Sequence, residues 1–192
     1  MGKNRLEAFS DGVLAIIITI MVLELKVPHG DSLLALKPIL PVFLSYVLSF
    51  IYVAIYWNNH HHLMHTVERV SASILWANMH LLFWLSLVPF ATAWMGESHF
   101  TSIPTALYGF ILLMAGFAFW VLQRAIIGSH GKESVLAKAI GGDVKGYGSI
   151  VLYTIAIPLA FYQEFLAGVI YVLVALFWLI PDRRIERRLS KL

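Results

Sequence analysis

The chain has 192 residues, of which 59% are hydrophobic and only 13% are charged, a balance that a soluble domain of this length does not carry. Its long apolar stretches indicate an integral membrane protein, and the lack of strand-like alternation favours helices over a β-barrel. The sequence contains no cysteine, which excludes disulfides, thiolate metal sites and cysteine nucleophiles. The formal net charge of +3 does not indicate nucleic-acid binding, because the basic residues lie beside apolar spans, where they act as topology signals.

Six apolar spans are predicted in chain order. They cover about residues 6–25, 41–63, 73–94, 104–127, 149–162 and 165–180. Only Gln163 and Glu164 separate the last two, which are short, so we expect a tight helical hairpin there, and Pro158 can kink the first of them. The sequence therefore predicts an all-α polytopic membrane protein with six transmembrane helices, organised as a single domain over residues 1–192.

Lysines and arginines are distributed unevenly between the connecting segments. If the N-terminus is placed in the cytoplasm, every basic residue except Lys26 and Lys37 falls on the inner side. The inner residues are Lys3, Arg5, Arg69, Arg124, Lys132, Lys138, Lys145, Arg183, Arg184, Arg187, Arg188 and Lys191. This bias predicts that both termini are cytoplasmic. The glycine-rich segment 128–148 is expected to form a short amphipathic piece at the inner surface.

The first span carries a carboxylate, Asp11, about one turn after its start. A carboxylate at the centre of a membrane helix costs roughly 2.5 to 3.5 kcal/mol, so Asp11 should face protein or water. Arg5 is six residues away and lies on another face of the same helix. A contact between these two side chains would therefore have to run between helices or between subunits.

Polar residues of three spans are expected at the same depth. Because successive spans run in opposite directions, Ser10 and Asp11 of the first span fall level with Trp57 and His61 of the second and Asn78 of the third. Buried polar groups need partners, and the hydrocarbon region offers no water to supply them. We therefore expect a polar layer near the cytoplasmic face that joins the first three helices.

A histidine cluster at residues 60–62 and 65 ends the second span. His61 and His65 are spaced i, i+4 and could ligate a metal on one helix face. A metal centre would need further ligands, and Asp11 is the acidic candidate at that depth. Helix packing is therefore the preferred interpretation of these histidines, and no metal site is expected.

The upper part of the first span carries a hydrophobic stripe. Ile16, Ile20 and Leu23 recur at i, i+4 and i+7, with Thr19 beside them. On periodicity alone this is a packing or lipid-facing surface, and it gains a role only if several copies of the helix surround an axis. Glu24 and the carbonyl end of the helix lie near its outer end and would attract cations, whereas Lys26 would oppose that attraction.

The first helix also carries the pattern Arg5-x-x-x-Phe9-Ser10-Asp11-Gly12-Val13, followed by Ala15-Ile16 and Thr19. This pattern resembles the first-helix signature of the endosomal/lysosomal potassium channel family of the transmembrane protein 175 type. The downstream motifs Trp57-x-x-His60-His61, Leu75-Trp76-x-Asn78, Ser86-Leu-x-Pro89-Phe90 and Thr92 are similar to the second and third helices of that family. The resemblance is to short prokaryotic members with one six-helix repeat. It covers the first half of the chain by motif and the second half by span count and length.

The resemblance implies a passive, modestly potassium-selective cation channel in the plasma membrane. It implies a homotetramer whose central pore is lined by the first helix, about residues 6–25, with potassium as the permeant ion, no cofactor and no catalysis. By this resemblance Ile16 would fall at the main hydrophobic constriction, Ile20 and Leu23 at the next narrow levels, and Thr19 at a hydroxyl ring. Glu24 would lie near the outer mouth of the pore. The implied structural polar network consists of Arg5, Phe9, Ser10, Asp11, Trp57, His61 and Asn78.

Two other functions remain open on the residues alone. One is a metal-dependent membrane enzyme or metal carrier built on the histidines, and the other is a structural membrane subunit that needs a partner. The sequence has no P-loop or other nucleotide motif, which agrees with passive flux.

Overall fold

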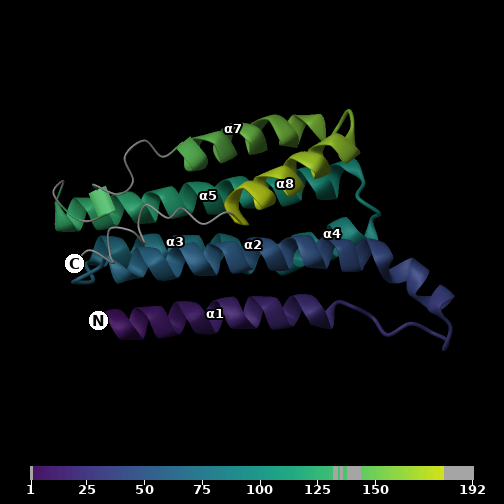
Figure 1. Cartoon of the computed structure of the whole chain (residues 1–192), viewed down its shortest axis with the longest axis horizontal. Coiled ribbons are helices and arrows are strands. Elements are labelled where there is room, and N and C mark those ends of the chain that lie inside the picture. The colour runs from purple at the N-terminus through teal and green to yellow at the C-terminus, as the bar shows by residue number, and fades with distance from the viewer. Residues whose placement is uncertain (1, 132–133, 135, 138–143, 180–192) are drawn as a thin grey trace.

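The structure, a computed structural model, describes residues 2–131, 134, 136–137 and 144–179, and these form helices that run back and forth along one axis (Figure 1). The helices are α1 (Lys3–Leu23), α2 (Leu40–His65), α3 (Ala72–Ser86), α4 (Val88–Glu97), α5 (Ser102–His130), α7 (Val144–Leu159) and α8 (Glu164–Leu179), and a 3-10 helix over Leu33–Ile39 precedes α2. The part of the chain that is described contains no strand. The predicted all-helical class is therefore confirmed.

Among the residues that the structure describes, four helical segments are long and apolar enough to cross a membrane: Lys3–Leu23, Leu33–His65, Ala72–Glu97 and Ser102–His130. The last two predicted spans correspond to α7 and α8, which have 16 residues each. A connection of a few residues joins them, as expected for a helical hairpin.

The predicted third span is a single crossing that breaks into two helices. Pro89 has no amide hydrogen, so the carbonyl of Leu85 loses its donor four residues ahead. The chain tightens here, because the N–H of Leu87 donates to the carbonyl of Trp84 at 3.2 Å. Regular α-helical bonding resumes in α4, where the N–H of Ala91 donates to the carbonyl of Leu87 at 3.1 Å.

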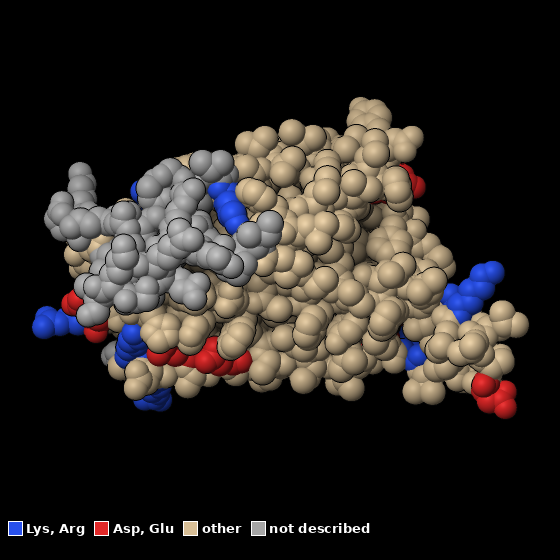
Figure 2. Space-filling view, in the orientation of Figure 1, with Lys and Arg blue, Asp and Glu red and all other residues tan. Residues whose placement is uncertain are grey.

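The two ends of the bundle differ in charge. The end that contains the start of α1, which we call the N-terminal end, also holds the α2–α3 connection, the end of α5 and the start of α7 (Figure 1). The described basic residues there are Lys3, Arg5, Arg69, Arg124 and Lys145, whereas Lys26 and Lys37 lie at the opposite end. Figure 2 shows that the middle of the visible face between the two ends carries no charged side chain. This pattern is typical of a protein that spans a bilayer.

Some of the basic residues that predict the orientation of the chain in the membrane lie outside the part that the structure describes. Lys132, Lys138 and the basic residues between 183 and 191 lie outside the described residues, as does much of the predicted amphipathic segment 128–148. The cytoplasmic location of the termini stays a prediction.

α1 lies at one edge of the bundle and α5 near its centre. α1 packs against α2, α3 and α4, whereas α5 packs against α3, α4, α7 and α8. Figure 1 shows α1 and α7 on opposite sides of the molecule. The inward face of α1 is a stripe spaced by three and four residues, made of Leu6, Ser10, Leu14, Ile17 and Met21.

Buried tyrosines join the helices of the core. Tyr52 of α2 donates its hydroxyl to the main-chain oxygen of Tyr171 in α8 at 2.6 Å, and the hydroxyl of Tyr153 in α7 donates to that of Tyr52 at 3.2 Å. The hydroxyl of Tyr171 donates to the carbonyl of Thr105 in α5 at 3.1 Å. The Tyr171 ring fits against Gly109, where an added Cβ would lie 2.7 Å from its Cζ atom. Glycine is thus required at this position by the close approach of α8 to α5.

The Gly109→Ala substitution is expected to lower the thermal stability of the detergent-purified protein. Overpacking of this kind costs about 1 to 3 kcal/mol, because Tyr171 must shift and lose its bond to Thr105. Gly116→Ala on the same helix is the matched control, since its Cβ would lie 3.7 Å from the Tyr56 hydroxyl, an ordinary contact. Thermal denaturation followed by size-exclusion chromatography measures both variants, and equal midpoints would contradict this account of the α5–α8 contact.

Candidate functional site

The outward face of α1 carries the hydrophobic stripe noted in the sequence. Ile16, Ile20 and Leu23 expose 58%, 42% and 78% of their surface in a single chain. Thr19 is also exposed, and its hydroxyl donates to the carbonyl of Ile16 at 2.9 Å. That bond uses the hydroxyl proton and leaves the oxygen lone pairs outward. The four residues expected at a constriction therefore lie together on the side of α1 that faces away from its own bundle.

A buried polar cluster ties α1 to its neighbours. Asn78 of α3 donates from Nδ2 to the hydroxyl oxygen of Ser10 in α1 at 2.9 Å, and its Oδ1 lies 2.7 Å from Nε2 of His60 in α2. Ser10 passes its own proton to the carbonyl of Leu6 at 2.9 Å. Because an amide oxygen only accepts, Nε2 of His60 carries the proton in this contact. The three polar side chains are fully or almost fully buried, and Asn78 alone bonds both other helices.

A second, exposed polar cluster lies beside the first. The indole N–H of Trp57 donates to Asp11 Oδ1 at 3.0 Å, so the carboxylate of α1 is held by α2. The ring of His61 stacks on Trp57, with centroids 6.0 Å apart and an interplanar angle of 26°. The Nε2 atoms of His61 and His65 are 3.1 Å apart. The structure thus places Ser10, Asn78 and His60 in a buried group and Asp11, Trp57 and His61 in an exposed one.

His60 is a member of the buried group that sequence reasoning did not select for the network. It lies seven residues after the buried Val53 and three before the buried Leu63, on the inward face of α2. His61 is one position further and falls off that face, where it is exposed. The spacing of the buried apolar residues around the histidine run therefore distinguishes the inward-facing His60 from the exposed His61.

Arg5 and Phe9, the other residues of the implied network, point away from the bundle. Both are exposed, Phe9 by 47%. Over the described ranges the one ion pair is Lys26 with Glu97, so Arg5 and Asp11 do not pair within a single chain. This agrees with the expectation that the two residues face different directions.

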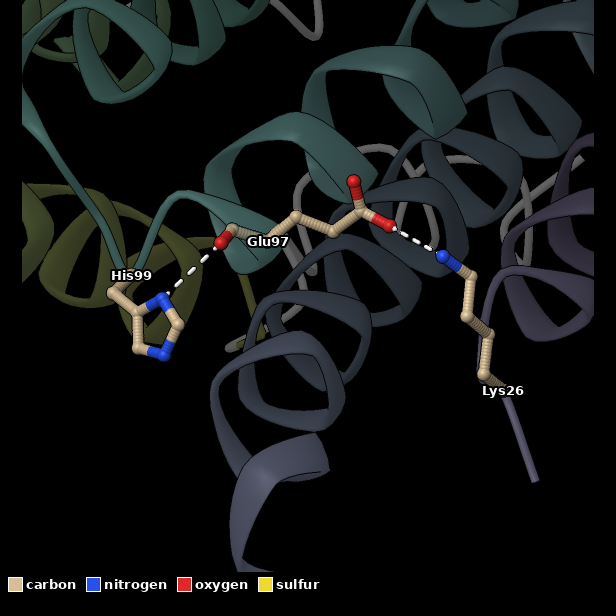
Figure 3. A network of polar contacts seen from close by, with 3 residues as sticks. All are labelled: Lys26, Glu97 and His99. Atoms are coloured by element: carbon tan, nitrogen blue, oxygen red, sulfur yellow. Dashed lines mark hydrogen bonds and ion pairs between the residues drawn. The ribbon is translucent and has the colours of Figure 1, made fainter. Parts of the chain in front are cut away.

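At the opposite end of the bundle, an ion pair links the segment after α1 to the end of α4. Lys26 Nζ donates to Glu97 Oε1 at 3.1 Å, and His99 Nδ1 lies 3.1 Å from the main-chain oxygen of Glu97 (Figure 3). Both side chains of the pair are largely exposed, so it contributes little to stability. The pair does change the local electrostatics, because the negative charge of Glu97 balances the positive charge of Lys26. The positive charge of Lys26 therefore opposes the exposed carboxylate of Glu24 less at this end of the bundle than the sequence alone indicates.

Replacing Asn78 by alanine is expected to destabilise the packing of α1 against α2 and α3. The change leaves a donor on His60 and an acceptor on Ser10 without partners, at about 1 to 3 kcal/mol for each group. Asn58→Ala is a suitable control, because Asn58 is half-buried on α2 and its side chain bonds no described residue. Thermal midpoints of the two purified variants test this, and an Asn78→Ala protein as stable as Asn58→Ala would show that the cluster does not hold α1.

Residues 5–89, which cover most of α1 and all of α2 and α3, match the family model described as endosomal/lysosomal potassium channel TMEM175. A protein of Chryseobacterium sp. (strain P1-3) named as a potassium channel is 59% identical over 191 residues, covering 100% of both chains. An endosomal/lysosomal proton channel TMEM175 of Gallus gallus is 33% identical over 103 residues, which are 47% of this chain and 21% of that protein.

A solved structure agrees with these sequence matches. The crystal structure of a lysosomal potassium-selective channel TMEM175 homolog from Chamaesiphon minutus superposes with a TM-score of 0.78 at 30% identity, covering 94% of this chain and 97% of the other. The fold is therefore that of a multi-pass channel protein over nearly the full length. On these matches and the geometry of its first three helices, the chain belongs to the TMEM175 family of endosomal/lysosomal potassium channels.

Proposed function

We propose that the chain forms a homotetrameric, modestly selective potassium channel in the plasma membrane, with four copies of α1 around a central pore. The observation that carries the proposal is the outward face of α1, where Ile16, Ile20 and Leu23 are exposed in a single chain. The bacterial relative of equal length and the solved homolog are both named for potassium, which supports potassium as the permeant ion. Because this family and fold are those of channels, the histidine-based enzyme or metal carrier is not favoured.

The position of α1 supports assembly around an axis. Its inward face is already packed, and its outward face combines the aliphatic stripe with the small Gly12 and the hydroxyl of Thr19. Small residues let membrane helices approach closely, which a ring of four requires. Arg5 and Asp11 make no ion pair with each other within one chain, so a neighbouring subunit can bring the guanidinium of one copy to the carboxylate of the next.

The chemistry of the stripe predicts how ions would pass. A ring of four isoleucines offers no oxygen to replace the hydration shell of an ion, so the ion crosses partly hydrated. Sodium holds its water more tightly than potassium, which gives a preference for potassium that depends on the pore width. A small rotation of the helices that narrows the ring would expel water and close the path. Selectivity and gating would then both depend on the Ile16 level, with Ile20 and Leu23 above it.

A bi-ionic reversal potential tests the function directly. Purified protein in planar bilayers, with potassium on one side and sodium on the other, should give a potential that favours potassium without ATP or any partner protein. Replacing the ion gradients by a pH gradient alone measures proton permeation. The absence of any conductance, or a potential set by protons only, would overturn the proposal.

The Ile16→Asn substitution should change conductance or the potassium-over-sodium preference, because it puts four polar groups at the narrowest level. Leu176→Asn on α8 is the control, since Leu176 is 52% exposed on a helix that is remote from α1. Both proteins are purified, checked for assembly and compared by reversal potential. If Ile16→Asn assembles normally and leaves the potential unchanged, Ile16 does not form the constriction.

Asp11 is expected to act in assembly more than in conduction. Asp11→Ala removes the acceptor for the Trp57 indole N–H and should lower the yield of the assembled protein. Asp11→Asn retains a carbonyl acceptor without the charge, so the pair of variants separates the hydrogen bond from the charge. Size-exclusion chromatography with light scattering reports the oligomer, and a wild-type yield of tetramer from both variants would exclude an assembly role.

A further inference from the structure

Two exposed histidines at the N-terminal end of the bundle share one face of α2. His61 and His65 are one helical turn apart and are both exposed. Their rings meet edge to face, with centroids 4.5 Å apart and Nε2 atoms at 3.1 Å. The Nε2 atoms of two imidazole rings therefore lie next to each other on one face of the helix.

The distance between these nitrogens matches that of two ligands on one metal ion. With metal–nitrogen bonds of about 2.05 Å, two ligand nitrogens are roughly 2.9 Å apart at a right angle and roughly 3.3 Å apart at the tetrahedral angle. The observed 3.1 Å falls between these values. Without a metal, one neutral ring donates to the other. When the donor ring moves that proton from its Nε2 to its own Nδ1, both Nε2 lone pairs become free to bind a metal ion.

The surroundings of the pair restrict its motion. Trp57 stacks on the ring of His61, and the ring of His62 packs edge-on against it with centroids 5.7 Å apart. A ligand that is already held loses less rotamer freedom on binding. The charge of Lys3 opposes metal binding, because it repels a cation. Its Nζ atom lies close to the site and donates to the main-chain oxygen of His65 at 3.3 Å. The site therefore needs a metal that imidazole binds strongly.

We propose that His61 and His65 form an exchangeable site for a divalent transition-metal ion of the copper, nickel or zinc class, for which imidazole is a preferred ligand. Among the residues that the structure places, no group of three or more His, Cys, Asp or Glu side chains converges, so water fills the other coordination positions. A structural zinc site, in contrast, is closed by four protein ligands. The site is an addition to the channel function and does not depend on it.

Equilibrium binding of Zn²⁺ tests the site on the full-length protein, purified without a polyhistidine tag. Competition with a chromophoric chelator should show one saturable Zn²⁺ per chain. His61→Ala and His65→Ala should each weaken binding by roughly tenfold or more, since the loss of even an outer-shell partner costs about 10- to 100-fold in metal affinity. His99→Ala removes a remote histidine that does not contact the pair, and this protein should bind Zn²⁺ as the wild type does.

Equal Zn²⁺ affinity in the wild type and in the His61→Ala and His65→Ala proteins would overturn the proposal, as would the absence of saturable binding. A measurement on the unmodified chain guards against variants that fail to fold. The Cu²⁺-loaded wild type should give an electron paramagnetic resonance spectrum with two imidazole nitrogens coordinated, and a spectrum with one or none contradicts the site. Because neither measurement involves ion flux, a failure of the channel proposal would leave these results unaffected.

Discussion

The arrangement of the first three helices depends on the rule that a polar group inside a membrane must find its partner within the protein. Asn78 meets this rule for two helices at once, since it donates to Ser10 and accepts from His60. A sliding or rotation of α1 would separate Ser10 from the amide in a medium that cannot replace the bond. The direction of the outward face of α1 is set by the same contact, because Ile16, Ile20 and Leu23 lie on the side away from Ser10.

This constraint explains why a helix at the edge of the bundle can still be held in a defined orientation. α1 packs against α2, α3 and α4, and its inward stripe fits between them over its whole length. Apolar packing alone gives weak selection of rotation in a bilayer, because lipid tails are as apolar as leucine. The buried amide of Asn78 fixes the rotation of α1 about its own axis, which apolar packing alone does not. The exposed Asp11–Trp57 contact adds a second link at nearly the same depth.

Much of the architecture could be predicted from the sequence, because hydrophobicity over some twenty residues is a strong signal. The spans, their order and the polar layer follow from it, and the all-helical class is confirmed. Two details could not be foreseen. The break at Leu87 results from the missing amide of Pro89, which a span count ignores. His60 and not His61 faces inward, because neighbouring residues on a helix point about 100° apart. The depth of a residue in the membrane does not show which of the two faces inward.

The exposed ion pair between Lys26 and Glu97 has a consequence for the effect of ionic strength. Its side chains are 80% and 54% exposed, so dissolved ions screen the attraction between them. At high salt concentration the segment after α1 is then held to the end of α4 less strongly than at low salt concentration. The electrostatic field at this end of the bundle would therefore depend on the salt concentration of the surrounding solution.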